Sequence, residues 1–269
     1  MKALLKQALG LKQALGAAGV VLALALTACG GTTTAGGSAS SSASSGGSLT
    51  VFAAASLTAT FTELGHDFEA AHPGSKVNFN FGGSSDLVSQ LQNGAPADVF
   101  ASADQTNMTK ATNAGLAAGT PQVFATNVLE IAVPPSNPAG IHTFQDLTKA
   151  GVRLVVCAQQ VPCGSAAQKA AKAARLTLKP VSEEQSVTDV LGKVISGDAD
   201  AGLVYVTDVK GAGSKVSGVA FPESSAAVNS YPIVALKDSK NAALSQEFVD
   251  FVRGAQGQKV LGDAGFGAP

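Results

Sequence analysis

The sequence contains no tryptophan, and aromatic residues make up only 5% of it, so a platform of stacked rings for sugars or bases is not expected. Charged residues are also scarce at 14%, and the formal net charge is −1, which argues against broad nucleic-acid binding through phosphate neutralisation. After residue 28 no uninterrupted apolar run approaches the roughly 18–20 residues of a membrane span. The 45% hydrophobic content excludes global disorder, and 269 residues suffice for one large or two modest domains.

The first 28 residues have the features of an export signal. Lys2, Lys6 and Lys12 supply positive charge, and residues 17–28 form a short apolar stretch. The sequence Leu-Thr-Ala-Cys at 26–29 resembles the bacterial lipobox, in which Cys29 receives a lipid before cleavage on its N-terminal side. The alternative is an ordinary signal peptide followed by an accidental cysteine. We expect a lipid anchor at Cys29 that holds the protein on the outer face of the cytoplasmic membrane.

A low-complexity segment follows the lipobox. Residues 30–48 consist only of Gly, Ser, Thr and Ala, which cannot bury enough apolar surface to offset the entropy of ordering. Residues 29–48 are therefore expected to be the lipidated cysteine and a flexible tether, with a root-mean-square reach of roughly 24 Å.

The other two cysteines, Cys157 and Cys163, belong to an exported chain, where disulfides form and persist. Five residues separate them, so a bond between them would stabilise the fold by roughly 2–2.5 kcal/mol in the loop-entropy account. The spacing is not that of a C-x-x-C redox motif. A structural disulfide is the preferred interpretation.

Short apolar runs alternate with helix-like stretches from residue 49 onward. In the first series, strands are predicted at 49–54, 76–81 and 98–101, and helices at 57–71, 85–93 and 105–114. In the second, strands are predicted at 128–133, 153–156, 202–206 and 231–236, and helices at 165–175, 188–196 and 242–253. The alternation predicts an α/β fold with parallel strands. We place a first lobe at 49–127 plus 231–269 and a second at 128–230.

Two strand-to-helix junctions carry serines that suit an anion. Ser56 follows the first strand, and Ser84 follows Gly82 and Gly83 after the second. A lone serine at such a place is explained by helix capping. Two junctions in one sheet favour an anion site, because both helix N-termini then lie at the carboxyl ends of strands, where open α/β sheets bind ligands.

The second series of predicted strands and helices contains further segments that suit an anion site. Residues 161–165 place Pro and Gly before a helix, residues 185–189 begin another, and Tyr205 stands at the end of a strand. None of these pieces contains Arg or Lys. Neutral donors suit an oxyanion that is fully ionised and needs no acceptor for a proton.

Over about residues 49–266 the sequence resembles the molybdate-binding, substrate-binding proteins of ABC transporters. The segments that carry the resemblance are VFAAASLT (51–58), FNFGGSSDL (79–87), GAPADVFASAD (94–104), NVLEIAVP (127–134), VPCG (161–164), DADAGLVYVTD (198–208), YPIVAL (231–236) and GFG (265–267). The resemblance implies a two-lobed periplasmic-binding-protein fold of type II with a hinged ligand cleft. It also implies that the protein binds molybdate and tungstate and delivers them to an ABC permease.

The resemblance further implies a set of oxyanion ligands. Ser56 and Ser84 would donate through their hydroxyls, Cys163 and Val187 through their backbone N–H groups, and Tyr205 through its phenol. Family members often have Ala at the position of Cys163 and Tyr at that of Ala166. The bound molybdenum would have no direct protein ligand. We expect no cofactor and a monomer whose partners are the oxyanion, the permease and, through Cys29, the membrane.

Other functions are considered beside this one. The ligand could be sulfate, phosphate or a small organic anion, or the chain could be an adhesive lipoprotein. An exported Ser-dependent hydrolase is less favoured, because no G-x-S-x-G elbow occurs and Ser56 has no evident base partner. The histidines and acidic pairs do not have the spacing of a metal site or an acid–base couple, and we expect no enzyme activity; they are His66, His72, His142, Asp98/Asp104 and Glu183/Glu184.

Overall fold

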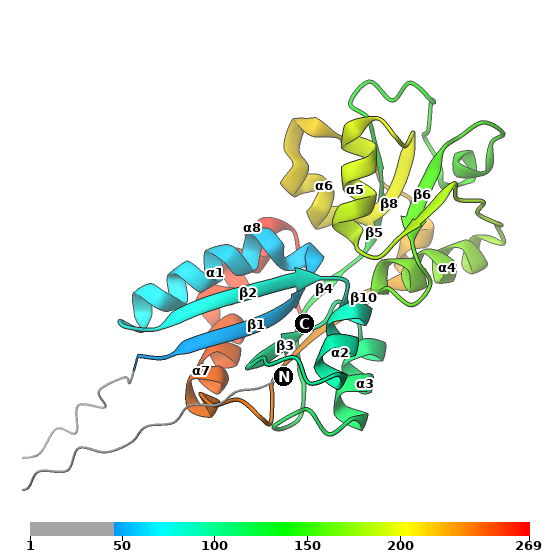
Figure 1. Cartoon of the computed structure of the whole chain (residues 1–269). Helices are drawn as coiled ribbons and strands as arrows, with labels where there is room; N and C mark the ends of the chain where they lie inside the picture. Colours follow the sequence, from blue (N-terminus) through cyan, green and yellow to red (C-terminus); the bar gives the residue numbers. More distant parts are fainter. Residues whose placement is uncertain (1–45) are drawn as a thin grey trace, which may run out of the picture. The chain divides into compact units, whose positions relative to one another are not determined.

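The computed structural model describes residues 46–269 (Figure 1). The predicted signal sequence, the lipidation site Cys29 and the tether up to residue 45 lie outside the described residues. Within 46–269 the chain forms two five-stranded sheets, each covered by helices. No helix in this range is long and apolar enough to cross a membrane.

Sheet 1 has the strand order β2-β1-β3-β10-β4. Strands β1 (Ser48–Ala54), β2 (Lys76–Gly82) and β3 (Val99–Ala101) are parallel. Strand β10 (Asn229–Ala235) is antiparallel to both of its neighbours, β3 and β4 (Gln122–Asn127). The helices of this half are α1 (Thr58–Ala71), α2 (Ser84–Gln92), α3 (Gln105–Asn113), α7 (Ala242–Arg253) and α8 (Ala255–Ala264). These elements are called half 1 below.

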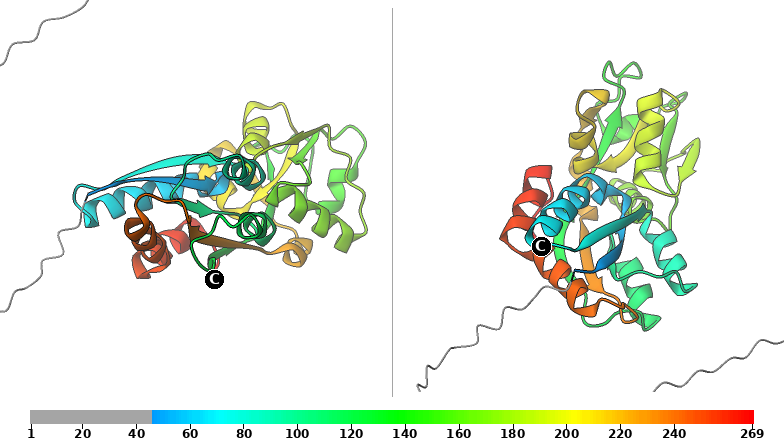
Figure 2. Two further views of the ribbon diagram at one scale, coloured as in Figure 1. Left: turned by 60° about the horizontal axis from the view of Figure 1, so that its bottom comes forward. Right: turned by 60° about the vertical axis from the view of Figure 1, so that its left-hand side comes forward.

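The alternation of side chains along β1 builds a core on each face of sheet 1. Leu49, Val51 and Ala53 pack in one cluster with aromatic residues of α1 and α7, while Phe52 packs in another with Leu87 and other apolar residues of α2 and α3. Helices α1, α7 and α8 therefore cover one face and α2 and α3 the other (Figure 2).

Sheet 2 has the order β7-β6-β8-β5-β9. Its strands are β5 (Leu129–Val133), β6 (Leu154–Cys157), β7 (Ser182–Glu184), β8 (Ala201–Tyr205) and β9 (Ser217–Val219), and its helices are α4 (Pro162–Ala174), α5 (Val187–Ser196) and α6 (Val206–Ala212). Strands β7, β6 and β8 are parallel, and β5 is antiparallel to β8 and β9. These elements are called half 2, and four short 3₁₀ turns complete the described secondary structure: η1 (Ala55–Leu57), η2 (Phe144–Thr148), η3 (Gly213–Lys215) and η4 (Pro222–Ala227).

The chain crosses twice between the sheets. It leaves sheet 1 after β4 and enters sheet 2 at β5 with only Val128 between them, and it returns from β9 through η4 to β10. The two halves are thus joined by two crossing segments, the second of which contains η4.

Most predicted elements lie within a few residues of the observed ones, and the differences have local causes. The helix predicted from residue 165 begins at Pro162, because proline is well suited to the first helical position. The strand predicted to end at Val206 ends at Tyr205, where α6 begins. The first predicted helix starts as the 3₁₀ turn η1 before α1. The sequence patterns did not indicate β4, β7, β9, α6 or α8.

Candidate functional site

A small cavity lies between the carboxyl ends of strands from both sheets. Its volume is only about 10 Å³, so the surrounding residues leave little free space. Five helical segments begin at its wall: η1, α2, α4, α5 and α6. Every lining residue is uncharged; the set is Ala54, Ala55, Ser56, Gly82, Gly83, Ser84, Ala103, Val161, Pro162, Val187 and Tyr205.

The serine hydroxyls belong to the half 1 wall. Ser56 lies in η1 directly after β1, and its Oγ is 3.0 Å from the Tyr231 hydroxyl. Ser84 is the first residue of α2, is 1% exposed, and its Oγ accepts the N–H of Ala103 at 3.0 Å. Because that contact uses the Ser84 oxygen as acceptor, its hydroxyl hydrogen is left to donate into the cavity.

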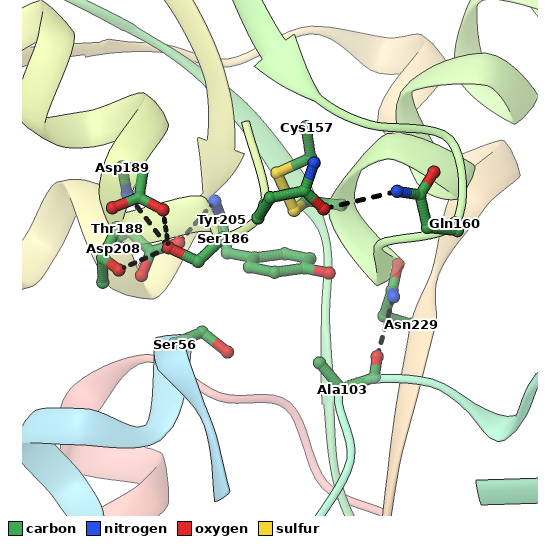
Figure 3. Close-up of a disulfide and its surroundings, with 12 residues drawn as sticks. Ser56, Ala103, Cys157, Gln160, Ser186, Thr188, Asp189, Tyr205, Asp208 and Asn229 are labelled. Carbon is green, nitrogen blue, oxygen red and sulfur yellow. Dashed lines mark hydrogen bonds between the residues drawn. A yellow bond between two sulfur atoms is a disulfide. The ribbon is translucent and has the colours of Figure 1, made fainter. Parts of the chain in front are cut away.

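Tyr205 lines the same cavity from half 2, and Figure 3 shows it on the other side from Ser56. Its side chain is 1% exposed, and its hydroxyl has no hydrogen-bond partner within residues 46–269. Burial raises the pKa of Tyr205 well above its usual value, so the phenol keeps its hydrogen. A buried hydroxyl with no partner costs free energy unless a ligand accepts from it.

The half 2 wall also brings the first turns of α4 and α5 to the cavity. Val187 begins α5, with Ser186 as its cap. Cys163 is the second residue of α4 and is bonded to Cys157, which ends β6. Its neighbours Val161 and Pro162 line the cavity, whereas Cys163 itself does not. The first N–H groups of a helix have no partner inside it, so both helices present donors here.

The structure therefore brings four of the five predicted binding residues to one cavity, namely Ser56, Ser84, Val187 and Tyr205, and places Cys163 directly behind the wall. The sequence patterns missed Tyr231, which lies on β10 and contacts Ser56. No local pattern around residue 231 indicated this, although the chain has only two tyrosines and their ring centroids lie 6.0 Å apart.

No charged side chain lines the cavity, so helix dipoles set the electrostatic potential there. The N-terminal ends of the helices carry partial positive charge, which favours an anion. Two acids lie near the cavity, and desolvation raises the pKa of both, that of Asp208 to about 7. Asp208 Oδ2 accepts the backbone N–H of Tyr205 at 2.8 Å. The arrangement suits an anion that is fully ionised.

Direct contacts join the two halves. Gly83 lies against the carbonyl of Gln185, because a Cβ built on Gly83 would be 2.0 Å from that oxygen. Asn127 donates to the Thr207 hydroxyl at 2.8 Å, and Lys210 donates to the backbone carbonyl of Asp263 at 2.6 Å. The halves are therefore closed on each other in this structure.

No group of three or more His, Cys, Asp or Glu side chains that could hold a metal ion occurs in the part of the chain that the structure describes. The histidines lie away from the cavity lining. His72, at the end of α1, is stacked on Phe68, and its Nδ1 donates to the Phe68 carbonyl at 3.0 Å.

Two α/β sheets joined by two crossing segments, with a neutral cavity lined by donors between them, define a solute receptor of the periplasmic-binding-protein type. The chain matches the family model "Bacterial extracellular solute-binding protein" over residues 49–267 and belongs to that family. It is a solute-binding protein and not an enzyme.

Comparisons with individual proteins agree with this. The chain is 51% identical over 222 residues to "Molybdate-binding protein ModA" of Mycobacterium tuberculosis, covering 82% of this chain and 85% of that one. It is 33% identical over 229 residues to the protein of the same name from Escherichia coli, covering 81% and 88%. A solved structure, the periplasmic molybdate-binding protein of Azotobacter vinelandii, superposes with a TM-score of 0.72 at 25% identity, covering 82% and 99%. The type II fold is thereby established.

Proposed function

We propose that this protein is the molybdate-binding component of an ABC transporter and that tungstate is a second ligand. The observation that carries the proposal is the buried, unpartnered hydroxyl of Tyr205, which faces Ser56 and Ser84 across a cavity without charged residues. The 51% identity to a molybdate-binding protein supports the same ligand. The oxyanion would accept from Ser56, Ser84 and Tyr205 through side chains and from Val187 and Cys163 through backbone N–H groups.

The chemistry of the donors favours molybdate and tungstate over related anions. Phosphate carries a proton near neutral pH and is best bound where an acceptor receives that proton. The lining offers donors and no carboxylate. Sulfate is fully ionised but smaller, and donors fixed on two opposing walls cannot all reach a shorter anion. Selectivity therefore follows from the separation of the walls.

Closure of two lobes would bury the captured anion. We place the lobes at residues 49–127 plus 231–269 and 128–230, so that the two crossing segments act as the hinge. Ser56 and Ser84 then belong to one lobe and Tyr205, Val187 and Cys163 to the other. Only the closed form offers all five donors, so the ligand stabilises closure, and the closed form is the one that the permease would recognise.

The N-terminal region would keep the receptor near its permease. We propose that Cys29 is lipidated and that the chain acts as a monomer on the outer face of the cytoplasmic membrane. Cys29→Ala should release the protein from the membrane fraction of a producing bacterium. A membrane-bound Cys29→Ala variant would contradict the anchor and leave the ligand proposal intact.

Isothermal titration of the full chain with molybdate, tungstate, sulfate and phosphate tests the ligand. We expect saturable binding of one molybdate or tungstate per chain, with sulfate and phosphate at least a hundredfold weaker. Tighter binding of sulfate or phosphate would assign the receptor to another oxyanion. Absence of binding to all four would overturn the proposal.

A further inference from the structure

The Cys157–Cys163 disulfide closes a short loop at the edge of the cavity. Cys157 is the last residue of β6 and Cys163 the second residue of α4, and each is 2% exposed. The enclosed residues 158–162 include Val161 and Pro162, which line the cavity. Figure 3 shows the disulfide beside the space into which Tyr205 projects.

The loop is a single tight turn. Val161 donates its N–H to the Ala158 carbonyl at 2.9 Å, and Ala158 donates to the Glu184 carbonyl of β7 at 2.8 Å. Gly164 is pressed against this turn, because a Cβ built on it would be 2.0 Å from the Ala158 oxygen and 2.5 Å from the Cys157 oxygen. The position of the loop thus fixes where the first N–H groups of α4 point.

The same loop is where half 2 meets half 1. The Gln160 carbonyl accepts from Asn107 Nδ2 of α3 at 3.4 Å. A Cβ built on Gly83, the residue before α2, would be 3.6 Å from Val161 Cγ1. A displaced loop would therefore disturb both the donors of α4 and the surface that closes on half 1.

We propose that the disulfide is a positioning element of the oxyanion site: it holds residues 158–162 and the N-terminus of α4 in their binding geometry before the ligand arrives. This rests on the proposed function and adds a determinant of affinity to it. Without the bond the same N–H donors exist, but the loop must be ordered at the moment of binding, and that ordering entropy weakens the complex.

The test compares the full wild-type chain with Cys157→Ala/Cys163→Ala by isothermal titration with molybdate at a temperature where circular dichroism shows both to be folded. We expect the double variant to bind about tenfold more weakly, the equivalent of ordering roughly one more backbone residue. The loss should be entropic, with the binding enthalpy unchanged or more favourable. Amide hydrogen exchange of residues 158–165 should be faster than in wild type in the free protein and equal in the complex.

Val133→Ala is the matched control, because it removes buried apolar volume from the end of β5 that pairs with β9, away from the cavity. It should lower the unfolding temperature and leave the affinity unchanged.

If the double variant does not fold, the wild-type chain in excess dithiol is measured instead. The dithiol gives two electrons and two protons to the two sulfurs and becomes a disulfide itself. Binding as tight as wild type, with unchanged exchange, would overturn the positioning role. Wild-type protein that does not bind molybdate would overturn the proposed function, while the exchange rates would still report on the loop.

Discussion

Gly83 in half 1 and the carbonyl of Gln185 in half 2 are in direct contact, with no space for a Cβ between them. The backbone of Gly83 has φ −62° and ψ 134°, which any residue can adopt, so glycine is required here for close approach and not for its conformational freedom. Gly83 directly precedes α2, which begins at Ser84, and Gln185 lies in the loop before α5, which begins at Val187. The contact therefore links the starts of these two helices. We therefore expect closure of the site to depend on this contact.

Gly83→Ala should therefore weaken molybdate binding at least tenfold, because the added methyl group would hold the halves apart. The stability of the free protein should change little, since an open form relieves the clash. Gly192→Ala is the control: it lies inside α5 with open space around it, and alanine should stabilise the helix by up to about 1 kcal/mol without changing affinity. Titration calorimetry and thermal unfolding measure both, and wild-type affinity in Gly83→Ala would show that closure is not needed.

Ser56→Ala and Ser84→Ala should each weaken binding by about 1–3 kcal/mol, the cost of losing a hydrogen bond to a charged group. Ser84→Ala should also destabilise the free protein by about 1–3 kcal/mol, because the buried N–H of Ala103 loses its acceptor. Ser89→Ala, exposed on the same helix, serves as control. Unchanged calorimetric affinity in both variants would remove the two serines from the site.

Tyr205→Phe separates binding from folding. The Tyr205 hydroxyl has no partner within residues 46–269, so its removal should leave the free protein equally stable or slightly more stable. Affinity for molybdate should fall about tenfold or more. Thermal unfolding with and without molybdate reads both quantities, since ligand stabilisation follows affinity. A variant that keeps the full ligand-induced shift would show that Tyr205 does not donate to the anion.

Asp208 should make stability depend on pH. Burial raises its pKa from 3.8 to about 7 in the folded protein, so between these values the native state holds a proton that the unfolded state has released. Stability contributed by this group is therefore present at low pH and is lost as pH rises toward 7, with an upper limit of about 3 kcal/mol between pH 5 and pH 8. Urea denaturation of wild type and Asp208→Asn at both pH values should show a smaller decline in the variant. Equal declines would contradict a buried, neutral Asp208.

The sequence predicted those elements whose apolar spacing is regular. Helix α7 was predicted with its observed bounds, because Leu244, Phe248, Val249 and Val252 recur on one face. Strands β7 and β9 have three residues each and lie at the edges of sheet 2, so a pattern of alternation cannot show in them. Helix α8 contains two glycines and buries little apolar surface, which weakens its periodicity.

The candidate site was predictable as separate pieces, since Ser56, Ser84, Val187 and Tyr205 each follow or precede a recognisable strand or helix. The residues of the site meet because of the order of the strands in each sheet. In sheet 1, β10 lies beside β3, and Tyr231 of β10 contacts Ser56, which is 175 positions away in the sequence. The close approach of Gly83 to Gln185 likewise depends on how the halves meet. Local sequence patterns do not indicate either of these two contacts.

A crystal structure of the full chain with molybdate, phased on the anomalous signal of molybdenum, tests the central claim most directly. We expect one strong peak between the two sheets, with the oxyanion within hydrogen-bonding distance of Ser56 Oγ, Ser84 Oγ and Tyr205 Oη. A peak elsewhere on the molecule, with these three hydroxyls not in contact with it, would contradict the account.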